Sequence, residues 1–170
     1  MIIFLIGFMG SGKTTLGKRL AKKISWDFMD MDHMIEQQEG MSVAAIFGQK
    51  GEEYFRKQES TLLQKLDSSH NMVVATGGGS PCFGNNMEVM NSKGITVYLR
   101  MHECSLATRL EKARTVRPLI EGLQPEELRK YIRQKLDERE PFYNQAHCII
   151  KGESVKPDHI ISLVFGNGDY

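Results

Sequence analysis

The residues best suited to chemistry begin seven positions into the chain, in the stretch Gly7-Phe8-Met9-Gly10-Ser11-Gly12-Lys13-Thr14-Thr15. The spacing G-x-x-x-x-G-K-T is typical of a loop whose backbone N–H groups cradle phosphate. In such a loop Lys13 reaches the β- and γ-phosphates, and the hydroxyl of Thr14 ligates Mg²⁺. The alternative is a glycine-rich turn that holds no ligand. We expect a nucleotide, held by Gly10, Ser11, Gly12, Lys13, Thr14 and Thr15.

Such a loop leaves open whether the protein transfers phosphate or only senses it. A sensor needs a second long segment that reads the γ-phosphate and an element that reads guanine, and we find neither pattern. Instead, Asp30 and Asp32 follow a short predicted strand. One carboxylate could serve Mg²⁺ and the other an acceptor hydroxyl. The alternative is that Asp32 caps the helix that follows.

A long helix predicted over residues 52–67 carries a charged pair near its apolar stripe. The 100° step of a helix places Glu59 inside the stripe that is centred on Phe55. A carboxylate on a buried face needs a partner, and Arg56 lies within reach. The alternative is a solvated pair, with Glu52 as a second possible partner of Arg56.

Three consecutive glycines, Gly77, Gly78 and Gly79, follow the strand predicted over residues 72–76. They let a ligand lie against bare backbone, although one bulge and one turn would also account for them. The strand has no acidic residue at its end. We therefore expect the second protein contact of the metal to come from Asp30.

The segment before Pro118 is basic and poor in apolar residues: Arg109, Lys112, Arg114 and Arg117. Such a segment would form a lid that excludes water and stabilises charge on the transferred group. A solvated charged loop is the alternative. Farther along, Arg139 falls on the apolar face of the last long helix, but Lys135 shares that face and leaves its direction open.

The elements that must position these groups alternate between strand and helix. A buried strand over residues 2–6 precedes the loop and an amphipathic helix follows it, and further strands are predicted over 26–29, 72–76, 95–99 and 148–150. Pro125 and Pro157 open the last two helices. The pattern predicts an α/β fold, a doubly wound, mostly parallel five-stranded sheet flanked by helices, with active residues at the carboxyl ends of the strands.

Composition limits the classes of partner and compartment. With 170 residues, of which 41% are hydrophobic, we expect one domain over 1–170 with a lid at about 110–124. The net charge of +1 argues against nucleic acid or an anionic membrane. The three cysteines are far apart and resemble reduced thiols of a cytoplasmic protein. The apolar start is too short for a leader or a membrane span.

Six motifs in order resemble the shikimate kinase family: G-x-M-G-S-G-K-T-T, D-x-D, F-R-x-x-E, G-G-G, R-P-L and R-x-P-x-Y. The resemblance implies a P-loop kinase that uses ATP and Mg²⁺ to phosphorylate the 3-hydroxyl of shikimate, as a monomer. Two alternatives stay open. One is a kinase of another small polyol acid, such as gluconate, and the other is a nucleotide-dependent binding protein without its own acceptor.

The resemblance also implies roles for individual residues. Arg56 and Arg139 would hold the carboxylate of shikimate. Asp32 and the middle glycine of the triplet, Gly78, would meet its ring hydroxyls, with Gly77 and Gly79 beside them. Guanidinium forks suit a carboxylate, and an aspartate suits a hydroxyl that must lose its proton.

On the nucleotide side, the resemblance makes Lys13, Asp32 and Arg117 the catalytic residues. Asp30 would lie near Mg²⁺ with Thr14, and Arg117 would belong to the lid that closes over ATP. Two departures stand out. Phe8 occupies a position where many members have proline, which we expect to affect only loop packing. The interval from Arg109, the expected adenine contact, to Arg117 is one residue longer than the spacing in the family.

Overall fold

The computed structural model describes residues 1–113 and 118–166, and its centre is a five-stranded sheet. The strands are β1 (Ile2–Ile6), β2 (Asp27–Asp30), β3 (Met72–Ala75), β4 (Gly94–Arg100) and β5 (Cys148–Lys151). Their order is β2-β3-β1-β4-β5, and each neighbouring pair is parallel. The predicted doubly wound sheet is confirmed, with strand bounds within one residue of those read from the sequence.

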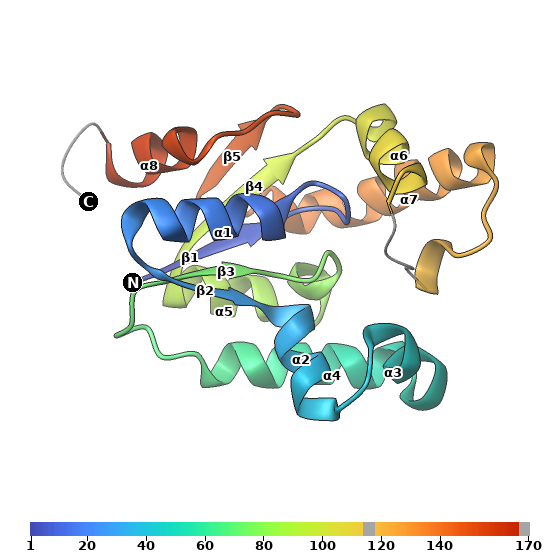
Figure 1. The fold of residues 1–170 in the computed structure, drawn as a ribbon, viewed down its shortest axis with the longest axis horizontal. Coiled ribbons are helices and arrows are strands. Elements are labelled where there is room, and N and C mark those ends of the chain that lie inside the picture. The colour runs from blue at the N-terminus through green and yellow to red at the C-terminus, as the bar shows by residue number, and fades with distance from the viewer. Residues whose placement is uncertain (114–117, 167–170) are drawn as a thin grey trace.

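Helices cover both faces of the sheet because β1 is apolar at every position (Figure 1). Side chains alternate between the two faces of a strand. Ile3 and Leu5 pack with α1 (Lys13–Ile24) and α8 (Pro157–Phe165) on one face. Phe4 packs on the other with α4 (Glu52–Lys65) and α5 (Asn86–Lys93). As predicted, Pro125 and Pro157 lie in the first turns of the last two helices.

A third apolar cluster joins the phosphate loop to α6 (Glu103–Glu111) and α7 (Pro125–Tyr143). Phe8 and Met9 pack there against Leu106 and Leu110 of α6, among others. The sequence analysis assigned no helix over residues 103–111, because the apolar positions are few and stand among charged ones. Of the predicted lid, the described parts are the end of α6, a short connection and the 3₁₀ helix η2 (Pro118–Ile120).

The predicted cap of α2 (Met31–Glu39) needs a correction. Asp30, and not Asp32, is the N-cap, because the Asp30 side chain accepts a hydrogen bond from the backbone N–H of His33. The helix begins two residues earlier than predicted, and Asp32 lies in its first turn.

Beyond α2 the chain forms α3 (Val43–Lys50), which the sequence analysis did not predict, and after β3 it forms the 3₁₀ helix η1 (Ser80–Cys82). The Ser42 side chain caps α3 by accepting from the N–H of Ala45. Within the described ranges, no helix is both long and apolar enough to cross a membrane.

Candidate active site

The phosphate loop lies between the end of β1 and the start of α1 (Figure 1). Gly10 and Gly12 have φ values of 82° and 93°, in the left-handed region that favours glycine, and this conformation lets the loop turn tightly into the helix. The buried ammonium of Lys13 donates hydrogen bonds to the carbonyls of Gly7 (2.8 Å) and Phe8 (2.9 Å). The loop thus places a lysine and the N-terminus of α1 around one concave site.

The two predicted metal ligands lie in contact. The hydroxyl of Thr14 donates to Asp30 Oδ2 over 2.7 Å. Across the described residues, no group of three or more His, Cys, Asp or Glu side chains could hold a metal ion by itself. A hydroxyl beside a carboxylate fits Mg²⁺, which takes oxygen ligands and usually completes its shell with phosphate and water.

Two neighbouring cavities open above this loop. The smaller, of about 200 Å³, lies over the loop and is lined by residues that include Gly12, Lys13 and Thr15. The larger, of about 680 Å³, extends toward α3 and α4. The two share a border formed by Met9, Thr14, Asp30, Asp32 and Gly78. A phosphate in one cavity and an acceptor in the other would therefore meet beside Asp32.

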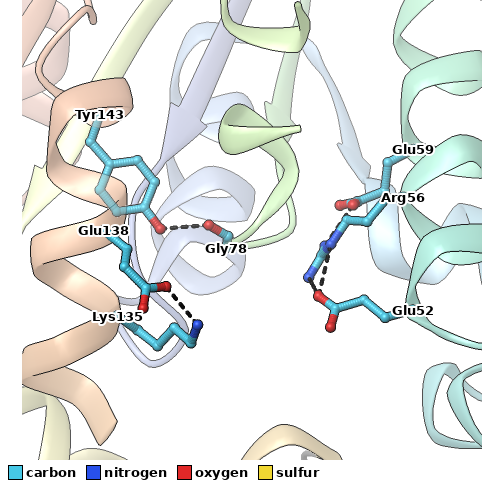
Figure 2. Close-up of polar contacts among 7 residues, drawn as sticks. All are labelled: Glu52, Arg56, Glu59, Gly78, Lys135, Glu138 and Tyr143. Atoms are coloured by element: carbon cyan, nitrogen blue, oxygen red, sulfur yellow. Dashed lines mark hydrogen bonds and ion pairs between the residues drawn. The ribbon is translucent and has the colours of Figure 1, made fainter. Parts of the chain in front are cut away.

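Arg56 forms one wall of the larger cavity, held by two carboxylates of α4 (Figure 2). Its guanidinium donates to Glu59 over 2.6 Å and to Glu52 over 2.8 Å. Arg56 is 8% exposed and Glu59 is 0% exposed, so the predicted alternative of a solvated pair is wrong. Burial raises the pKa of Glu59 to about 7, although the Arg56 guanidinium favours the charged form.

Arg139 lines the same cavity from α7. It is 8% exposed, and its Nη1 atom is buried without a hydrogen-bond partner. From the sequence alone, either Arg139 or Lys135 could point toward the site. In the structure Lys135 pairs with Glu138 over 2.6 Å (Figure 2). One turn after Arg139, the hydroxyl of Tyr143 donates to the carbonyl of Gly78 and fastens α7 to the glycine loop (Figure 2).

None of the three glycines has a positive φ, so close approach accounts for them, more severely at Gly77 and Gly79 than at Gly78. A Cβ atom on Gly77 would lie 2.2 Å from Glu59 Oε1, and one on Gly79 would lie 2.5 Å from Arg56 Nη2. A Cβ atom on Gly78 would lie 3.1 Å from the backbone nitrogen of Met9. The site's own side chains and the phosphate loop thus press against this backbone, and the alternative of one bulge and one turn does not account for it.

Several residues that are not predicted from the sequence lie around the site, some of them beside Arg109, the expected adenine contact. Arg109, on α6, donates to the carbonyl of Glu153, and the Ser105 hydroxyl donates to the Glu153 side chain over 2.6 Å. This cluster adjoins Gly12 of the loop, but no local pattern joins residues so far apart in the sequence. Phe47 of the unpredicted α3 also lines the larger cavity. Arg117 lies outside the described residues.

A phosphate loop beside β1, where the strand order reverses direction, with an acceptor cavity next to it, defines the class of P-loop kinases that act on small molecules. Within that class the chain belongs to the shikimate kinase family, because the family model described as shikimate kinase matches residues 9–165. Members of this family use ATP.

Individual members of the family are similar to this chain over most of their length. The chain is 43% identical to the shikimate kinase of Parabacteroides distasonis over 153 residues, which are 90% of this chain and 88% of the relative. The crystal structure of shikimate kinase from Bacteroides thetaiotaomicron matches with a TM-score of 0.91 and 38% identity, covering 97% of this chain and 98% of that one. Shikimate kinase from Acinetobacter baumannii, solved in complex with shikimate, matches with a TM-score of 0.88 and 34% identity, covering 98% and 93%.

Proposed function

We propose that this chain transfers the γ-phosphoryl group of ATP to the 3-hydroxyl of shikimate, giving 3-phosphoshikimate. The observation that carries the proposal is the pair of buried arginines, Arg56 and Arg139, which line one cavity from α4 and α7. A small acid with ring hydroxyls fits a cavity that offers guanidinium groups together with a carboxylate. The relative from Acinetobacter baumannii, crystallised with shikimate, supports the same substrate.

On the acceptor side, we assign the shikimate carboxylate to Arg56 and Arg139. Planar guanidinium groups pair with carboxylates through two parallel N–H···O bonds, and the buried Nη1 of Arg139 has no hydrogen-bond partner among the described residues. Asp32 and the backbone of Gly78, with its neighbours Gly77 and Gly79, would face the ring hydroxyls, because they lie along that cavity.

On the nucleotide side, Lys13 would leave the carbonyls of Gly7 and Phe8 to bind the phosphates in the smaller cavity. Thr14 and Asp30 would hold Mg²⁺, which neutralises phosphate charge when it is bound. Asp32, on the border of the cavities, would orient the acceptor hydroxyl and take its proton. We further propose that Arg117 and a lid over about 110–124 close over ATP.

The base of ATP is assigned to the cluster beside α6. Arg109 and the carbonyl of Glu153 lie next to the loop, where a planar guanidinium could stack on adenine. We further propose a monomer as the working unit and 1–170 as a single domain. The three cysteines are free thiols, which supports a cytoplasmic location.

The test is to incubate the purified protein with ATP and Mg²⁺ and to follow ADP with shikimate, with gluconate and without an acceptor. We expect ADP release only with shikimate. Turnover only with gluconate would select the kinase of another polyol acid. Absence of any acceptor-dependent turnover would select a binding protein without an acceptor. The Lys13→Ala variant is the control, and its kcat should fall by about a hundredfold or more while the fold is retained.

A further inference from the structure

The two cavity arginines are held in different ways. Arg56 is paired with Glu52 and Glu59, so that nearby negative charge offsets its own. Arg139 has no such partner, because no carboxylate in the part of the chain that the structure describes forms an ion pair with it. The two arginine residues are equally buried, each with 8% of its surface exposed. Something other than a carboxylate must therefore stabilise and orient the Arg139 cation.

The ring of Phe8 faces Arg139, and the Tyr143 hydroxyl on the same helix also interacts with it. The central carbon of the guanidinium lies 5.2 Å from the ring centroid, within the distance at which a cation is attracted to an aromatic face. Phe8 is 1% exposed, and its cluster includes Leu106 and Ile132 of α6 and α7. A ring that is packed on all sides cannot turn away, so it provides a fixed surface for the guanidinium.

An aromatic face can stabilise the Arg139 cation without using its N–H donors, which a carboxylate cannot do. The π-face attracts the positive charge but does not occupy the N–H donors, and it carries no net charge. A carboxylate partner would compete with a bound acid for the same N–H groups. The ring thus leaves both the donors and the full positive charge of Arg139 available to an anionic ligand.

We propose that Phe8 is a positioning residue for shikimate binding, and that its ring holds the guanidinium of Arg139 in the direction of the acceptor carboxylate. This inference rests on the proposed function, in which Arg139 binds that carboxylate. It also gives Phe8 two roles, since its backbone carbonyl accepts a hydrogen bond from Lys13. Phe8 would therefore affect substrate binding in addition to the packing of the loop.

The experiment replaces the ring by apolar side chains without a π-face, in Phe8→Leu and in Phe8→Met, the second of which is unbranched and can adapt its shape to the space that the ring leaves. Calorimetric titration with shikimate and steady-state kinetics are the measurements. We expect the affinity for shikimate to fall by about threefold to tenfold, with KM for shikimate rising and KM for ATP within about twofold of the parent. Phe4→Leu is the matched control, because Phe4 is a buried phenylalanine of β1 that packs in a different apolar cluster from Phe8. It should lower thermal stability but leave KM for shikimate unchanged.

A second set of variants separates this inference from the function on which it rests. Arg139→Ala should weaken shikimate binding, and adding Phe8→Leu to it should cause no further loss, because the ring then has no guanidinium to hold. If Arg139→Ala weakens binding but Phe8→Leu and Phe8→Met bind shikimate like the parent, the inference about Phe8 is overturned. An equal loss of shikimate and ATP binding in the Phe8 variants would also overturn it, since that is the effect of a disturbed loop. Unchanged shikimate affinity in Arg139→Ala itself would instead overturn the proposed role of Arg139.

Discussion

Asp32 lies in the first turn of α2, on the border between the two cavities, while its neighbour Asp30 caps the helix. The helix cap thus belongs to Asp30 and not to Asp32, to which we assign the acceptor hydroxyl. The Asp30 carboxylate accepts one hydrogen bond from the backbone N–H of His33 and another from the hydroxyl of Thr14. A change at Asp32 therefore leaves the helix cap in place, and its effect on activity can be measured in a folded protein.

We predict that Asp32→Asn lowers kcat by about tenfold or more, because the amide cannot take the proton of the acceptor hydroxyl. The effect is bounded because the transition state of phosphoryl transfer is loose. KM for shikimate should rise only modestly, and the free energy of unfolding should stay within about 0.5 kcal/mol of the parent. Kinetics and urea unfolding provide the measurements, and Asp27→Asn, at an exposed position of β2, is the control. A stable variant with the parental kcat and KM would contradict the role.

Helix α4 brings its charged residues together through ordinary helical spacing. Glu52, Arg56 and Glu59 are three or four positions apart and therefore lie on one side of the helix. The sequence predicts this much, since the period of the helix places Glu59 within the apolar stripe. It does not establish the partner of Arg139, because the ring of Phe8 comes from a loop more than a hundred residues away.

The buried carboxyl of Glu59 makes stability depend on pH. Its pKa of about 7 in the folded chain exceeds the ordinary value of 4.5, so the folded state binds this proton more tightly. The resulting stabilisation is fully present below about pH 4.5 and is lost as the pH rises to about 7. Because Glu59→Gln cannot titrate, its free energy of unfolding relative to the parent should increase between pH 5 and pH 8.

Urea unfolding of both proteins at the two pH values measures this increase. Glu53→Gln is the control on the same helix, because Glu53 is exposed and a hydrogen bond from Lys57 lowers its pKa. For that variant the difference from the parent should not increase with pH. A constant difference for Glu59→Gln between pH 5 and pH 8 would mean that Glu59 does not titrate in this range.

At the scale of the whole molecule, the acceptor cavity is bounded by elements that are distant in the sequence. Arg56 comes from α4 and Arg139 from α7. Figure 2 shows Gly78 of the glycine loop between these two helices. An acid that binds both arginines joins these elements in the folded chain, and the unfolded chain has no such site. Binding of the acid should therefore stabilise the entire fold.

We predict that shikimate at about one hundred times its Kd raises the midpoint of thermal unfolding by roughly 5–10 °C. The estimate follows from about 2.7 kcal/mol of stabilisation and from about 2–4 °C per kcal/mol for a chain of this size. At the same shikimate concentration the shift should be clearly smaller in Arg139→Ala and Arg56→Ala. Scanning calorimetry measures it, with gluconate as the control acid. Equal shifts in the parent and both variants would show that the arginines do not bind the ligand.

The order of the elements is largely predictable from this sequence, but some contacts between them are not. Apolar runs such as residues 2–6 predict the strands, and the phosphate loop predicts the edge of the sheet at which the site forms. Helix α3 is short and follows a polar connection, so its eight residues carry too little periodicity for a prediction. The contact of Arg109 with Glu153 depends on how α6 and the end of β5 meet, which is a property of tertiary packing.

The close contacts of the glycine loop (Gly77, Gly78 and Gly79) also limit which substitutions can be tolerated there during evolution. A side chain at Gly77 or Gly79 would collide with the end of Glu59 or Arg56, and a second mutation that shortens the colliding side chain could relieve the overlap. A side chain at Gly78 would instead meet the backbone of Met9, which no replacement of a neighbouring side chain removes. In a library of random variants, suppressors should therefore be recoverable at neighbouring side chains for the outer two glycines, whereas a side chain at the middle one needs the backbone of the phosphate loop to shift by a few tenths of an ångström. Two of these positions would evolve together with Arg56 or Glu59, and the third would evolve together with the path of the phosphate loop.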